Sequence, residues 1–106
     1  IRNPHYHNTV WVYYLQSQPV GFVSYFKKNP YTGYMLFLGV KQDCRGQRIG
    51  WKLVDFACKK LKDLGCVKVE LVTQVDNKAS RSLYEKFGFK AYSIDDKYVH
   101  YRKMLK

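Results

Sequence analysis

The chain has 106 residues, of which 46% are hydrophobic, and its 19 Lys and Arg against 8 Asp and Glu give a formal net charge of +11. These numbers suit one folded domain and argue against disorder, and with no long apolar run or evident signal peptide we expect a cytoplasmic protein that does not enter a membrane. The positive charge favours a polyanionic ligand and disfavours a polycationic substrate.

Segments rich in β-branched and aromatic residues predict three β-strands in the first part of the chain. With turn signals at 16–19 and 27–30 between them, these strands are expected at 9–15, 20–26 and 34–40. The first two should form a hairpin, and the third is nearly all apolar, as in a strand covered on both faces. Gly39 near its end indicates a bulge or a close approach of the backbone.

Helical periodicity follows the third strand. Apolar residues recur at intervals of three and four from Ile49 to Leu64, and Gly65 is well suited to end that helix. Residues 67–72 then alternate between apolar and polar types, which predicts a half-buried strand.

A second helix is expected to begin at a cap residue, Asp76 or Asn77, and to end at Gly88. Two final strands are predicted, joined by a tight turn at 95–97, at 89–94 and 98–105. The order is therefore β-β-β-α-β-α-β-β, in one domain covering residues 1–106. The strand–helix–strand crossover implies one parallel strand pair in an otherwise antiparallel, mixed α/β (α+β) sheet.

The loop Arg45-Gly46-Gln47-Arg48-Ile49-Gly50 lies between a strand and a helix. A basic, glycine-containing loop at this place offers backbone N–H groups and a helix N-terminus to a phosphate. The spacing of Gly46 and Gly50 matches neither the P-loop nor the dinucleotide-binding pattern. An ordinary basic connection is the alternative interpretation.

A second motif occupies residues 77–89 and contains Asn77, Ala79, Leu83-Tyr84 and Gly88-Phe89. Together with the loop, it resembles the GNAT superfamily of N-acetyltransferases, and the resemblance covers roughly residues 9–106. The loop departs from the family pattern at Arg48, where glycine is usual.

The resemblance implies transfer of an acetyl group from acetyl-coenzyme A to a primary amine, of a small molecule or a protein, by direct attack and without a metal. It also implies helices on both faces of the sheet and a splayed parallel strand pair that admits the arm of the cofactor. The residues that it places at the cofactor are Leu38, Gly39, Val40, Arg45, Gly46, Gln47, Arg48, Ile49, Gly50, Asn77 and Tyr84. Solvent exposure of Arg48 and simple helix capping by Asn77 are the alternatives for those two side chains.

Tyr84 matches the general acid of the family, which protonates the departing thiolate; the alternative is an aromatic side chain that only packs on the helix. The base is left open. Glu70 is the best carboxylate candidate, followed by His100 or a water relay.

The sequence gives less support to metal binding and to nucleic-acid binding. His5 and His7 lack a third metal ligand, and the aromatic residues fit sheet packing better than nucleic-acid stacking. Few residues precede the first strand, so residues 1–8 are interpreted as the remnant of a missing N-terminal region. The acceptor stays open, as does the choice between monomer and homodimer. The alternative function is a non-catalytic coenzyme-A-binding or interaction module.

Overall fold

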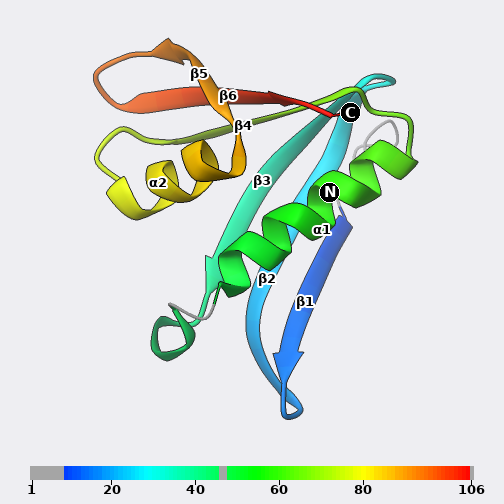
Figure 1. Cartoon of the computed structure of the whole chain (residues 1–106), viewed down its shortest axis with the longest axis vertical. Coiled ribbons are helices and arrows are strands. Elements are labelled where there is room, and N and C mark those ends of the chain that lie inside the picture. Colours follow the sequence, from blue (N-terminus) through cyan, green and yellow to red (C-terminus); the bar gives the residue numbers. More distant parts are fainter. Residues whose placement is uncertain (1–8, 46–47, 106) are drawn as a thin grey trace, which may run out of the picture.

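The computed structural model describes residues 9–45 and 48–105, which form one six-stranded sheet with two α-helices (Figure 1). In chain order the elements are β1 (Thr9–Leu15), β2 (Gln18–Asn29), β3 (Thr32–Val40), the 3₁₀ helix η1 (Gln42–Cys44), α1 (Ile49–Asp63), β4 (Lys68–Gln74), α2 (Lys78–Phe87), β5 (Lys90–Ile94) and β6 (Tyr98–Met104). The strands lie in the order β1-β2-β3-β4-β6-β5. The β3–β4 pair is parallel and the other described pairs are antiparallel, so the predicted element order and the mixed, mostly antiparallel α/β sheet are confirmed.

The first hairpin is tighter and longer than the sequence predicted. Gln16 and Ser17 have φ angles of 50° and 66°, the left-handed values that match a two-residue turn to the twist of its strands. The predicted break at 27–30 comes too early, because β2 continues to Asn29, with Lys27 and Asn29 paired to Gly33 and Thr32 of β3. The Asn29 side-chain oxygen accepts a hydrogen bond from the Tyr31 N–H at 2.9 Å, which fixes the next turn.

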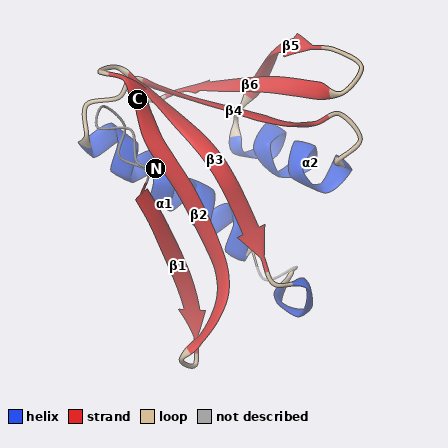
Figure 2. Cartoon of the chain, turned by 180° about the vertical axis from the view of Figure 1, so that it is seen from behind, coloured by secondary structure: helices blue, strands red, loops and turns tan. Residues whose placement is uncertain are grey.

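The parallel strands separate after a short paired stretch. β3 pairs with β4 only from Thr32 to Met35, and beyond that point the two strands diverge (Figure 2). Leu36 is the extra residue where the β2–β3 register shifts, and such a bulge bends a strand. The splay is therefore confirmed and the place expected for its bulge, Gly39, is wrong. Gly39 pairs regularly with Phe22, whose ring occupies the space that a Cβ atom would need.

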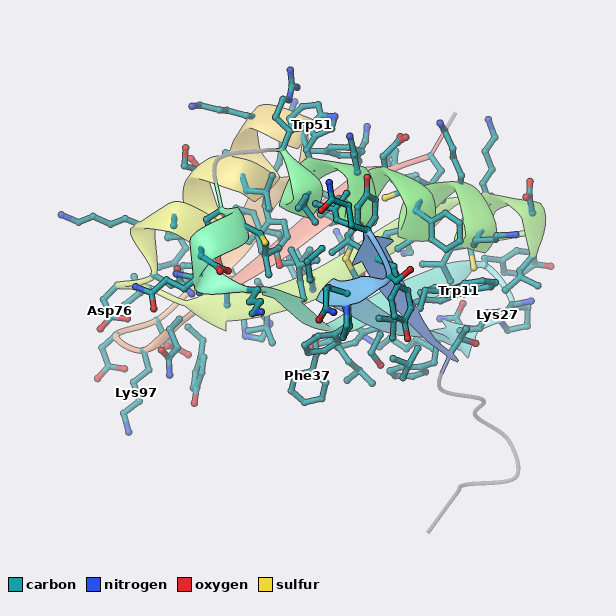
Figure 3. All side chains as sticks on the ribbon, turned by 90° about the horizontal axis from the view of Figure 1, so that it is seen from below. Trp11, Lys27, Phe37, Trp51, Asp76 and Lys97 are labelled. Carbon is teal, nitrogen blue, oxygen red and sulfur yellow. The ribbon has the colours of Figure 1, made fainter. Side chains whose placement is uncertain are left out.

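Both described helices pack on the same face of the sheet (Figure 3). Leu71 of β4 lies between Met35 of β3 and Tyr101 of β6, so these cross-strand neighbours share a face, and the ring of Tyr101 contacts α2. We expected helices on both faces. In the described residues they share one, because the apolar stripe of α2 packs against α1 as well as the sheet, with the Trp51 and Phe87 rings 4.7 Å apart. Within 9–45 and 48–105, no helix is long and apolar enough to cross a membrane.

Candidate functional site

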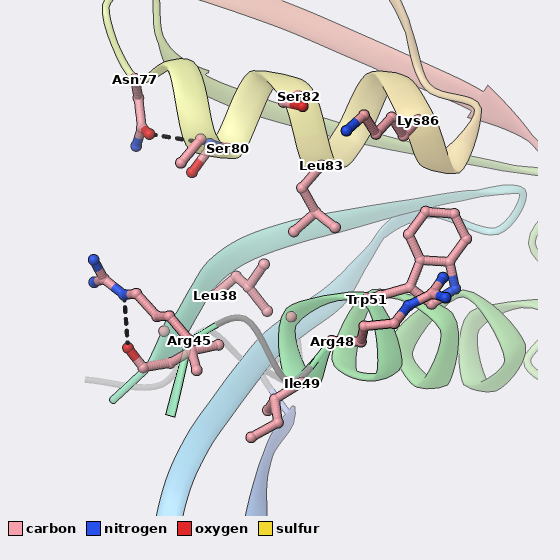
Figure 4. A pocket seen from close by; sticks show the side chains of 14 residues that line it. Leu38, Arg45, Arg48, Ile49, Trp51, Asn77, Ser80, Ser82, Leu83 and Lys86 are labelled. Carbon is pink, nitrogen blue, oxygen red and sulfur yellow. Dashed lines mark hydrogen bonds between the residues drawn. The ribbon is translucent and has the colours of Figure 1, made fainter. Parts of the chain in front are cut away.

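A cavity of about 800 Å³ opens where the end of β3, the start of α1 and one side of α2 meet (Figure 4). This volume is within the range of small-molecule and cofactor sites. The residues that line it are Leu38, Gly39 and Val40 of β3; Arg45, Arg48, Ile49, Gly50 and Trp51 of the loop and α1; and Asn77, Ala79, Ser80, Ser82, Leu83 and Lys86 around α2.

The N-terminus of α1 faces this cavity without a side-chain cap. Arg48 is the N-cap residue, its side chain makes no capping hydrogen bond, and the first turn contains no acid. The first N–H groups of a helix have no partner within the helix, and the helix dipole places partial positive charge there. At Gly50 a Cβ atom would lie 3.2 Å from Leu83 Cδ2, so glycine lets α2 approach closely. The arrangement suits an anionic group held by backbone N–H donors.

Arg48 has a left-handed backbone, with φ 61° and ψ 22°. Non-glycine residues adopt this conformation uncommonly, which explains why glycine suits the position. The side chain is exposed, and its guanidinium lies 5.1 Å from the centre of the Trp51 ring (Figure 4). Arg48 therefore belongs to the cavity rim, where its charge is available to a ligand.

The charge of the lining is positive. Arg45, Arg48 and Lys86 contribute cations, and the lining residues in the described part of the chain include no carboxylate. The Arg45 Nε donates to the Val40 carbonyl oxygen at 3.3 Å, which joins the loop to the end of β3. A ligand with several negative charges fits this lining better than a neutral one does.

Asn77 combines two features that the sequence left as alternatives. Its side-chain oxygen accepts a hydrogen bond from the Ser80 N–H at 3.1 Å and caps α2, and the residue also lines the cavity (Figure 4). Of the other residues assigned to the cofactor, Gly46 and Gln47 lie outside the described residues, as do His5 and His7. Elsewhere in the described chain, no three His, Cys, Asp or Glu side chains meet as metal ligands would.

Tyr84 lies on the side of α2 that faces the sheet and is not among the residues that line the cavity. It is 7% exposed, and its ring packs 5.8 Å from that of Phe89 and 6.1 Å from that of Tyr101. Burial raises the pKa of the Tyr84 hydroxyl to about 12. The hydroxyl therefore keeps its proton at neutral pH.

Glu70 lies on the other face of the sheet, because it alternates with Val69 and Leu71, which face the helices. It is 4% exposed, and its two oxygens accept hydrogen bonds from Lys28 at 3.0 Å and Arg102 at 2.9 Å. Burial by itself would raise the pKa of this carboxyl, but the two cations outweigh it and hold the pKa below its ordinary value. A carboxylate in this state is a poor general base at neutral pH.

His100 is on the same face as Glu70, since it is two residues from Arg102 on β6. Its ring packs 6.0 Å from that of Tyr92. The structure thus brings neither candidate base to the cavity between the helices.

Sequence reasoning missed several residues on α2 and α1 that line the cavity: Trp51, Ala79, Ser80, Ser82, Leu83 and Lys86. Part of this set was accessible from spacing alone. Ser80, Leu83 and Lys86 follow Asn77 at intervals of three, so they lie along one side of the helix that Asn77 begins.

Comparison with known proteins gives one consistent result. The model of the acetyltransferase (GNAT) family matches residues 2–89. N-alpha-acetyltransferase 30 of Schizosaccharomyces pombe is 38% identical over 60 residues, which are 57% of this chain and 40% of that protein. A mycothiol acetyltransferase of Geodermatophilus obscurus is 35% identical over 64 residues, 60% of this chain and 21% of that protein. The matched part thus spans less than half the length of either relative.

Solved structures share the fold. The PaiA N-acetyltransferase from Thermoplasma acidophilum, in complex with coenzyme A, superposes with a TM-score of 0.87 at 23% identity, covering 92% of this chain and 61% of that one. A chain of the NatC complex bound to Gag peptide and CoA gives a TM-score of 0.73 at 29% identity, covering 83% of this chain and 62% of that one.

Proposed function

The chain belongs to the GNAT acetyltransferase family, and we propose that it transfers an acetyl group from acetyl-CoA to a primary amine. The observation that carries this proposal is the uncapped start of α1, which faces a cavity lined by three cations. Coenzyme A carries a pyrophosphate and a further phosphate, so its charge complements this lining. The residues present therefore fit the donor.

The backbone at the start of α1, from Ile49 to Trp51, would hold the pyrophosphate, with Arg45, Arg48 and Lys86 adding charge. Beyond Met35, the side of β3 that faces β4 has no strand partner among the described residues. Its main-chain groups are therefore available to an extended ligand arm, as at other exposed strand edges. An N–H group of Leu38 or Val40 would polarise the thioester carbonyl.

Tyr84 is the general acid in this proposal. The amine nitrogen attacks the thioester carbon, the C–N bond forms, and the C–S bond breaks. The nitrogen loses one proton and the sulfur gains one. With a pKa of about 12 the hydroxyl is protonated at neutral pH and so carries the proton that the sulfur needs. Its role as the donor rests on the family motif, because Tyr84 is not among the residues that line the cavity.

The acceptor must arrive as a neutral amine, and its own pKa decides how often it does. A protein α-amine has a pKa of about 7.8 and a lysine amine one of about 10.4, so at neutral pH the neutral fraction of the α-amine is roughly 300-fold higher. Glu70 is paired with two cations and is not available to remove a proton. We therefore propose a peptide or protein α-amine as acceptor, in accord with the name of the N-alpha-acetyltransferase relatives. The mycothiol acetyltransferase relatives make a small amine the alternative outcome.

Release of the CoA thiol tests the proposal directly. One peptide has a free N-terminus and no lysine, its partner has a blocked N-terminus and one lysine, and a set of small primary amines is assayed beside them. We expect thiol release with the first peptide to exceed that with the second by at least about tenfold, from the difference in amine pKa. Faster release with the lysine peptide contradicts the acceptor assignment. Acetyl-CoA binding without turnover on any amine indicates the non-catalytic coenzyme-A-binding module, and no binding contradicts both functions.

A further inference from the structure

Arg81, Glu85 and Tyr101 form a hydrogen-bonded group between α2 and the sheet that the chemistry above does not use. The Arg81 Nε donates to the Tyr101 hydroxyl at 3.1 Å, and that hydroxyl donates to Glu85 Oε2 at 2.5 Å. A second guanidinium nitrogen of Arg81 donates to the Val75 carbonyl at 3.1 Å, and a third lies 3.8 Å from Glu85. The group thus joins α2 to β6 and to the connection that precedes α2.

The sheet side of this group is buried and belongs to a paired strand. Tyr101 is fully buried, with no exposed surface, and lies opposite Leu71 of β4 in the β4–β6 pair. β4 is one of the two strands that separate at the splay. The hydroxyl of Tyr101 therefore links the groups that bond to it to the sheet beside the splay.

Tyr84 lies next to the hydrogen-bonded group of Arg81, Glu85 and Tyr101. It is three residues after Arg81 and one before Glu85, and its ring centre is 6.1 Å from that of Tyr101. Rotation or sliding of α2 against the sheet would move the Tyr84 hydroxyl with it. Bonds at residues 81 and 85 restrain such motion on either side of Tyr84.

Apolar packing also attaches α2 to the rest of the molecule. Leu83, Tyr84 and Phe87 already pack against the apolar core, and ion pairs as exposed as Arg81–Glu85 contribute little to stability. What directional hydrogen bonds add is a defined orientation, which apolar packing specifies less strictly.

We propose that Arg81, with Tyr101 and Glu85, is a positioning residue that sets the place of the Tyr84 hydroxyl. The proposal rests on the proposed role of Tyr84 as general acid. Its consequence is that removing the Tyr101 hydroxyl, or the Arg81 guanidinium, lowers turnover only while Tyr84 has its own hydroxyl.

A kinetic cycle tests this dependence. Tyr101→Phe keeps the ring and removes the hydroxyl, and Arg81→Met keeps a long helix-forming side chain. We expect each to lower kcat about tenfold, with the best acceptor of the panel, because small misplacements of a reacting group are costly. In a Tyr84→Phe background the same changes should lower kcat less than about twofold. The Kd of acetyl-CoA should stay within about threefold throughout, since Arg81 and Tyr101 do not line the cavity. Equal losses in both backgrounds, or a Kd that rises with the loss in kcat, overturn the proposal.

The matched control is Lys59→Met, which breaks the exposed Lys59–Asp55 pair of α1, 2.8 Å long, and should change none of these values. The second readout needs no turnover. In spectra of the free protein with ¹³C-labelled tyrosine, the Tyr84 ring signal is identified by its loss in Tyr84→Phe. It should shift or broaden in Arg81→Met and stay in place in Lys59→Met, and an unchanged signal in both overturns the positioning role. Wild-type protein without turnover on any amine would instead contradict the proposed function, while the ring signal still decides whether Arg81 positions Tyr84.

Discussion

Replacing Glu70 by Gln distinguishes two roles for this carboxylate, a structural one in the fold and a catalytic one as a base. Glu70 is 4% exposed and bonded to two cations, whereas the side chains of Lys28 and Arg102 are 51% and 39% exposed and can return to water when the charge is removed. The stability lost in Glu70→Gln is therefore smaller than the loss on breaking an ion pair whose two partners are both buried. Two charge-assisted hydrogen bonds weakened at one buried site correspond to about 2 kcal/mol of unfolding free energy.

For a domain of this size, about 2 kcal/mol corresponds to a fall in Tm of roughly 8 °C. Urea unfolding and thermal unfolding monitored by circular dichroism measure the two values, with Asp55→Asn, in an exposed pair, as the control that should change little. The folded-state pKa of Glu70 is lowered, so its stabilisation is present above the pKa of the unfolded chain and is lost as pH falls through the folded value. Wild type and Glu70→Gln should therefore converge in stability as the pH falls from about 4.3, the ordinary pKa of a Glu side chain, through the lowered folded-state value.

The same variant should turn over within about twofold of the wild-type rate, since the carboxylate is not placed as a base. If the turnover rate instead falls by about two orders of magnitude or more while stability is unchanged, this reasoning is refuted and Glu70 belongs to the chemistry.

Four further outcomes are expected. Tyr84→Phe should lower kcat by about 10²–10⁴-fold while the calorimetric Kd of acetyl-CoA changes little. A wild-type rate in this variant would contradict the assignment of Tyr84 as the general acid. Because the pKa of Tyr84 is raised to about 12, ionisation of this group should cause no loss of wild-type turnover below about pH 11; an earlier basic limb would have to vanish in Tyr84→Phe to be assigned to it. Arg48→Gly should weaken acetyl-CoA binding about fivefold at low salt and less at high salt, with Tm almost unchanged, and a salt-independent effect would argue against a phosphate contact. Gly33→Ala should destabilise the chain by about 1–3 kcal/mol in urea unfolding, because its Cβ would lie 2.5 Å from Leu61 Cδ1, and an unchanged midpoint would mean that Leu61 repacks freely.

The sequence carried most of the element order because local signals agreed with the final fold. Ile49 to Leu64 has helical periodicity, Asn77 caps α2, and the Asp95 side chain accepts hydrogen bonds from the Lys97 and Tyr98 amides in the predicted tight turn. Each of these features depends on residues close together in the chain, so a single sequence is enough to find it.

The remaining features depend on contacts between distant residues. β2 extends to Asn29 because β3 pairs with Lys27 and Asn29, although the composition of this segment indicated a break. The bulge falls at Leu36, and no local signal distinguishes that residue from its apolar neighbours. The single covered face follows from packing of Trp51 on Phe87, which are far apart in the sequence.

The residues of the candidate site likewise fall into those that a local motif predicts and those that only the structure reveals. Motif residues such as Arg48, Gly50 and Asn77 line the cavity, as the resemblance implied for cofactor contacts. Lys86 and Trp51 were missed because a basic helix residue and a tryptophan after the loop have no motif of their own. Glu70 was considered as a base from its place on β4, but the choice of sheet face and its two cationic partners were not readable without the structure.

The most direct test of the account is a calorimetric titration of the wild-type chain with acetyl-CoA, set beside S-acetylpantetheine, which lacks the nucleotide and its phosphates. The cavity at the start of α1 predicts one acetyl-CoA bound per chain, with an affinity at least about tenfold higher than that for S-acetylpantetheine and falling as salt is added. Equal affinity for the two compounds, or no binding of acetyl-CoA, would contradict the claim that this cavity holds the phosphates of the donor.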